Sequence, residues 1–62
     1  MNNLQDYLGR KIFVGFRASN GITLYHTGRL ENIGMVYIRI QGRSETFKVP
    51  IKTLQSISEV KQ

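Results

Sequence analysis

Residues 20–34, NGITLYHTGRLENIG, place three glycines around a run of residues that favour β-strands. Asn20-Gly21 is a typical hairpin turn, because these residues tolerate the positive φ that a tight turn requires. The run that follows predicts a strand, and Gly28 falls inside it. A glycine within a strand marks a bulge, a sharp bend or a close approach of backbones. We therefore predict that Gly28 is a structural bend, the alternative being that it ends the strand early.

The sequence on either side of this stretch predicts further short strands, because apolar residues alternate with polar ones. The expected strands cover 11–17, 22–32, 35–41, 46–51 and 56–60, with one helical turn at 52–55. The residues expected on the inner face are Ile12, Val14, Phe16, Ile22, Leu24, Leu30, Val36, Ile38, Ile40, Phe47, Val49 and Ile51, and His26 and Gly28 share that parity. Residues 2–11 predict a short helix, capped by Asn2 or Asn3 and stopped by Gly9.

The expected fold class is therefore mainly β, with residues 1–62 forming a single small domain. A short N-terminal helix precedes a strongly bent, five-stranded antiparallel sheet. Pro50 cannot donate to a β-ladder, so it marks a strand end or an edge. So few residues cannot make a two-sheet sandwich, and curling the sheet into a small barrel removes its exposed edges.

The length and the net charge of the chain limit the kinds of function and partner that we expect. A chain of 62 residues without cysteine has no disulfide or thiolate metal site to stabilise it, so either very efficient packing or self-association is expected. Nine Lys and Arg against four Asp and Glu give a net charge of +5. This excess favours an anionic partner, nucleic acid before a membrane surface, although it also suits solubility alone. No apolar run approaches the ~18 residues of a membrane span, and a cytoplasmic location is expected.

Catalytic chemistry has little support in the sequence. His26 is the only histidine, and the four acids form no paired motif; they are Asp6, Glu31, Glu45 and Glu59. We expect neither an enzyme nor a metal site nor a cofactor. The lone histidine is typical of a core or interface residue.

The outward-facing strand positions carry cations and aromatics together, as on surfaces that bind single-stranded nucleic acid. The alternative is an ordinary solvated sheet face, or one covered by the helix or a neighbour. The candidates from this pattern are Arg17, Tyr25, Arg29, Tyr37 and Arg39, with Lys11 and Phe13 on the same face. Arg43 in the 42–45 turn is either a phosphate donor or a solvated cation.

Several short strings, in order, resemble the Sm-like family and its Hfq-like members. They are LQDYL (4–8), KIFVGF (11–16), NGITL (20–24), GRLEN (28–32), VYIRI (36–40) and FKVPIKTLQSIS (47–58). The chain differs from the family by a longer second strand, and by Gly34 where an acid is usual. It also has Val36, beside Tyr37, at a base-stacking position, and Val49 in place of a histidine.

The resemblance implies a homo-oligomeric ring, a hexamer or heptamer, in which the fourth strand of one subunit pairs with the fifth strand of the next. It also implies that Lys48 and Gln5 contact RNA. Our first hypothesis is thus a non-catalytic, Sm-like homo-oligomer that binds U-rich or A-rich single-stranded RNA. The alternatives are an SH3-like protein–protein interaction module and a small DNA-binding barrel of regulatory or phage type.

Overall fold

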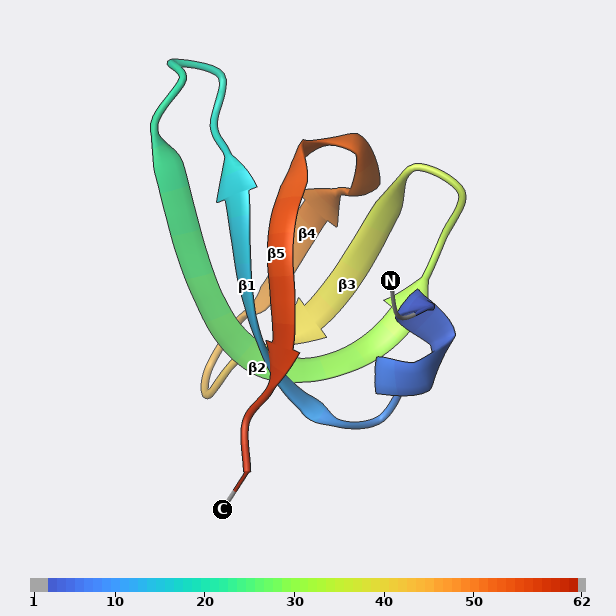
Figure 1. Ribbon diagram of the computed structural model, residues 1–62. Helices are drawn as coiled ribbons and strands as arrows, with labels where there is room; N and C mark the ends of the chain where they lie inside the picture. Colours follow the sequence, from blue (N-terminus) through green and yellow to red (C-terminus); the bar gives the residue numbers. More distant parts are fainter. Residues whose placement is uncertain (1–2, 62) are drawn as a thin grey trace.

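Five strands form one antiparallel sheet in the computed structural model, which describes residues 3–61 (Figure 1). The strands are β1 (Lys11–Arg17), β2 (Thr23–Ile33), β3 (Tyr37–Gln41), β4 (Thr46–Pro50) and β5 (Leu54–Glu59). They lie in the order β4-β3-β2-β1-β5. Consecutive strands from β1 to β4 are neighbours, and β5 returns to pair with β1. The predicted mainly-β class and five-stranded antiparallel sheet are therefore confirmed.

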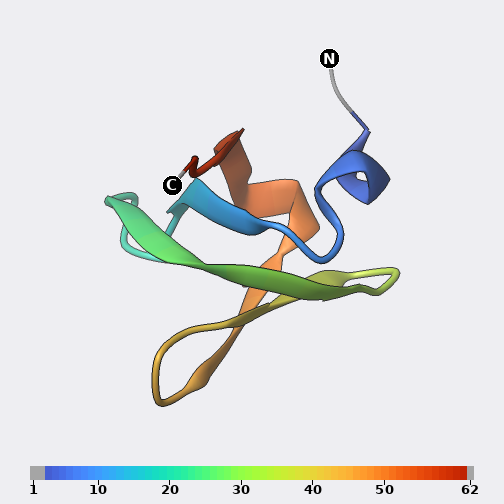
Figure 2. The ribbon, with the colours of Figure 1, turned by 90° about the horizontal axis from the view of Figure 1, so that it is seen from below.

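Strand β2 runs through Gly28 without a break and changes partner there. It pairs with β1 over residues 23–29 and with β3 over residues 29–33. A Cβ on Gly28 would lie 2.5 Å from the carbonyl oxygen of Gln41 and 2.7 Å from Cγ2 of Ile40. Only a hydrogen fits where the backbones of β2 and β3 approach so closely. A register shift between Leu30 and Asn32 follows at once, and β2 curves beneath the rest of the sheet (Figures 1 and 2).

The turn between β1 and β2 differs from the expected two-residue hairpin. Only Gly21 has positive φ, at +86°, while Asn20 does not. The Gly21 amide donates to the Ala18 carbonyl, and the Ala18 amide donates to the Ile22 carbonyl. The side chain of Asn20 accepts a hydrogen bond from the Ile22 amide at 3.1 Å. These bonds define a three-residue loop with glycine in the left-handed position, a standard hairpin solution.

The N-terminal helix is reduced to one 3-10 turn, η1 (Leu4–Tyr7), so the prediction of a helix over 2–11 is wrong. The side chain of Asn3 caps it by accepting from the Gln5 amide at 3.2 Å. The chain is already extended at Leu8, and Gly9 has a φ of +82°. Only the four residues Leu4–Tyr7 lie between the Asn3 cap and this break, which is too short a span to propagate an α-helix. Asn2, the other expected cap, lies outside the described residues.

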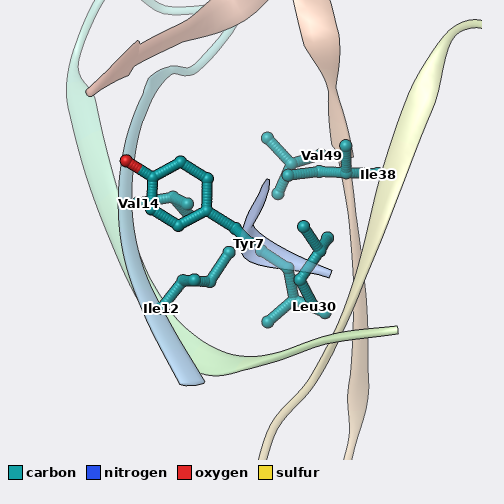
Figure 3. Close-up of a cluster of buried hydrophobic side chains, with 7 residues drawn as sticks. Tyr7, Ile12, Val14, Leu30, Ile38 and Val49 are labelled. Atoms are coloured by element: carbon teal, nitrogen blue, oxygen red, sulfur yellow. The ribbon is translucent and has the colours of Figure 1, made fainter. Parts of the chain in front are cut away.

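The core lies on the concave side of the bent sheet. Side chains from η1 and four strands point into one space (Figure 3). The buried residues are Tyr7, Ile12, Val14, Leu30, Ile38, Ile40 and Val49. Phe16, Phe47 and Ile51 are partly buried against them, as are Leu4, Ile33, Leu54 and Ile57. Half-buried His26 stacks on Phe47 with ring centroids 3.9 Å apart, which joins β2 to β4 across the bend.

Three apolar residues of the expected inner face are exposed instead. Ile22, Leu24 and Val36 are 57%, 44% and 57% exposed. Ile22 precedes β2 and Leu24 lies at its start, beside the hairpin loop, while Val36 lies in the turn between β2 and β3. The start of β2 and the turn that follows β2 therefore extend beyond the side chains that pack in the core, whereas Ile33 at the end of β2 still packs against it. The alternation of apolar residues thus predicts the face of the sheet on which a side chain lies. It does not predict how far along each strand the core covers that face.

The sheet is not closed, so the expected closure of a small barrel is not seen. Strands β4 and β5 are the two edges, joined by a second 3-10 turn, η2 (Ile51–Thr53). The Ile51 amide donates to the Val36 carbonyl, which anchors this turn at the end of the β2–β3 hairpin. The chain thus turns one residue earlier than expected, and β5 begins at Leu54 and pairs with β1 rather than with β4.

Candidate functional site

Two aromatic rings stack on the outer, convex face of β1 and β2. Tyr25 lies opposite Gly15, and because Gly15 has no side chain, the tyrosine ring covers it and reaches Phe13. The two ring centroids are 5.3 Å apart and the planes differ by 10°. Phe13 and Tyr25 are nevertheless 41% and 57% exposed. A stacked aromatic pair is therefore presented to solvent.

Cations flank this stacked pair. Lys11 lies opposite Arg29 in the β1–β2 register, two positions beyond the pair formed by Phe13 and Thr27. Both side chains are exposed, and neither forms an ion pair within residues 3–61. The sequence contains no acid from residue 7 to residue 30. We call Lys11, Phe13, Tyr25 and Arg29 the β1–β2 patch; it combines uncompensated positive charge with exposed aromatic surface.

An open hollow of about 1120 Å³ continues from the β1–β2 patch toward the β3–β4 turn and the end of the chain. We call it the basic hollow, because its lining includes Lys11, Arg29, Arg43 and Lys61. Two carboxylates also line it, but each pairs with a cation outside the lining. Glu31 lies 3.4 Å from Nε of Arg39, and Glu59 lies 3.2 Å from Nη1 of Arg10.

A second group of candidates lies on the outer face of β3 and β4. Arg39 is opposite Lys48, and Tyr37 is opposite Pro50. Tyr37 is 49% exposed beside Met35, which is 99% exposed in the turn. We call Tyr37, Arg39 and Lys48 the β3–β4 patch. The bend of β2 separates this half of the sheet from the β1–β2 half, as seen from below in Figure 2.

The remaining predicted site residues lie elsewhere. Arg17 ends β1 opposite Thr23, at the base of the hairpin loop. Gln5 lines a largely apolar hollow of about 640 Å³ with residues such as Leu4, Ile33 and Leu54. Lys48 does not line this hollow. The structure thus brings Tyr25 and Arg29 together, and Tyr37, Arg39 and Lys48 together, but does not join all seven candidates in one site.

The sequence pattern does not indicate two members of the basic hollow. It does not single out Lys61 as a site residue, and it does not predict that Arg43 lies near Lys11. The amide of Val60 donates to the carbonyl of Lys11 at 2.8 Å, which carries the end of the chain past β1. The signal that could have placed Lys61 is the pairing of β5 with β1, because this pairing brings the residues after β5 close to Lys11.

Two further features are absent from the part of the chain that the structure describes, a metal-binding cluster and a membrane-spanning helix. Residues 3–61 contain no cluster of three or more His, Cys, Asp and Glu side chains suited to hold a metal ion. They also contain no helix with the length and hydropathy needed to cross a bilayer. The imidazole of His26 is instead packed between Phe16 and Phe47.

Comparison with protein-family models, curated proteins and solved structures finds no match to this chain.

Proposed function

We propose that this protein binds single-stranded RNA without catalysing a reaction. The observation that carries the proposal is the exposed Phe13–Tyr25 stack, flanked by Lys11 and Arg29, which have no ion-pair partner within residues 3–61. Cations neutralise phosphates and release counterions, while aromatic rings stack on bases. Single strands fit this surface better than duplexes, because their bases are free to stack on protein side chains.

Fluorescence anisotropy with labelled oligo(U) and oligo(A) tests this function. We expect saturable binding at 50 mM salt that weakens as salt is raised to 200 mM, because counterion release drives association. Unlabelled duplex DNA should compete poorly. Equal competition by the duplex would favour the DNA-binding alternative, and absence of RNA binding at 50 mM salt would leave the protein-interaction module as the better account.

The β1–β2 patch yields a sharper prediction about stacking. Tyr25→Ala should weaken oligo(U) binding by about 5- to 150-fold, because base stacking is worth about 1–3 kcal/mol. Tyr25→Phe keeps the ring and should bind like the parent chain. If Tyr25→Phe lost as much affinity as Tyr25→Ala, the contribution of the ring would be refuted. Both affinities are measured by the same anisotropy titration.

We also propose that the chain assembles as a small-barrel, Sm-like homo-oligomer of six or seven copies. The support is that β4 and β5 are unpaired edges of an open sheet, since open edges invite pairing with another chain. Light scattering after size exclusion should give six or seven times the chain mass of 7.1 kDa. A single species at 7.1 kDa near neutral pH would exclude the ring.

A further inference from the structure

The basic hollow lies where the bend of β2, the β3–β4 turn and the residues after β5 meet. Its cations come from four separate segments, and Gly28 and Gly42 also line it. Lys11 and Arg29 face each other across β1 and β2. Arg43 follows β3 in the turn, and Lys61 follows β5. The fold therefore gathers positive charge that is dispersed in the sequence.

The charge of the hollow is not cancelled by its carboxylates. Glu31 and Glu59 are each held by an arginine outside the lining, Arg39 and Arg10. The four lining cations form no ion pair within residues 3–61. Exposed like charges gathered in this way repel one another, so an anion that enters the hollow relieves this repulsion.

The hollow is also continuous with the aromatic pair. Lys11 and Phe13 are two residues apart on β1, so their Cα atoms are about 7 Å apart along the strand. Both point to the outer face, as does Arg29 on β2. A single-stranded RNA that stacks a base on the Phe13–Tyr25 pair can thus extend its sugar–phosphate backbone into the hollow.

We infer that the basic hollow binds the phosphates of the RNA strand whose bases stack on the β1–β2 patch. This inference rests on the proposed function and assigns Arg29, Arg43, Lys11 and Lys61 to the RNA backbone. Guanidinium groups suit this role, because their forked donors match phosphate oxygens. The β3–β4 patch, on the other half of the bent sheet, is not needed for this path.

The test compares salt dependence in single variants of equal net charge. Arg29→Gln, Arg43→Gln and the control Lys52→Gln each lower the net charge from +5 to +4. Lys52 is exposed in η2 and does not line the hollow. Binding of labelled oligo(U) is measured from 50 to 200 mM salt, after circular dichroism has shown that each variant is folded.

Each hollow variant should reduce the slope of log affinity against log salt by about 0.7, the value for one phosphate contact on a single strand. The ratio of the RNA affinity of the parent chain to that of the variant is then about 2.6-fold larger at 50 mM than at 200 mM salt. Lys52→Gln should keep the parental slope. If the parent chain binds RNA, the inference would be overturned by unchanged slopes in both hollow variants. It would also be overturned by a reduction of the slope in Lys52→Gln equal to that in the hollow variants. Failure of the parent chain to bind would instead refute the proposed function.

Discussion

Replacement of Gly28 by alanine is expected to lower the melting temperature by roughly 10 °C. The added Cβ would lie 2.5 Å from the Gln41 carbonyl oxygen, which belongs to the backbone of β3 and cannot swing aside. Overpacking of this kind costs about 1–3 kcal/mol, and each kcal/mol shifts the midpoint by about 4–8 °C in a domain of this size. Thermal unfolding followed by circular dichroism measures the shift.

Gly15→Ala is the matched control for this prediction. Gly15 is also a buried strand glycine, and its Cβ would also meet atoms closer than 3.0 Å. Those atoms belong to the side chains of Ser56 and Tyr25, and Tyr25 is exposed enough to move. Gly15→Ala should therefore cost clearly less than Gly28→Ala. Equal losses in the two variants would show that the approach of β2 to β3 is not the reason for a glycine at the bend.

Leu30→Ala is expected to remove most of the folding free energy. Leu30 is fully buried on the central strand β2, and such truncations cost about 2–5 kcal/mol. At about 0.05–0.15 kcal/mol per residue, the whole chain has only about 3–9 kcal/mol to lose. Urea denaturation should show a much lower midpoint, or a chain that is largely unfolded without denaturant.

Leu24→Ala provides the comparison on the same strand. Leu24 is 44% exposed near the hairpin loop, so the same truncation should cost about 1 kcal/mol or less. A large loss from Leu24→Ala, equal to that from Leu30→Ala, would contradict the placement of the core at the middle of β2.

The sequence predicts the strands well because their signal is local. Alternation of apolar residues places Ile12, Val14, Ile38 and Ile40 on the buried face correctly. The same rule fails at Val36, because alternation reports the side of a sheet and not whether another segment covers it. Coverage is a long-range property, set by where β4, β5 and η1 lie. The prediction of an N-terminal helix fails for a local reason, because the backbone is extended at Leu8, with only four residues between it and the Asn3 cap.

The candidate site is only partly predictable for the same reason. Parity alone puts Tyr25 and Arg29 on the outer face, where the structure has them. It does not reveal that the Tyr25 ring reaches across Gly15 to Phe13, because this depends on the strand register. Nor does it join Arg43 to the other cations of the basic hollow. That arrangement depends on the bend and on the position of β5 beside β1.

Mapping of amide chemical shifts tests the central claim most directly. Unlabelled oligo(U) is added to the ¹⁵N-labelled chain at low salt, and the shifted amides are assigned. We predict that the largest changes cluster at Lys11, Phe13, Tyr25 and Arg29, extend to Arg43, and leave the amides of η2 nearly unchanged. Changes centred instead on the apolar hollow beside Gln5, or no changes at saturating RNA, would contradict an RNA-binding outer face.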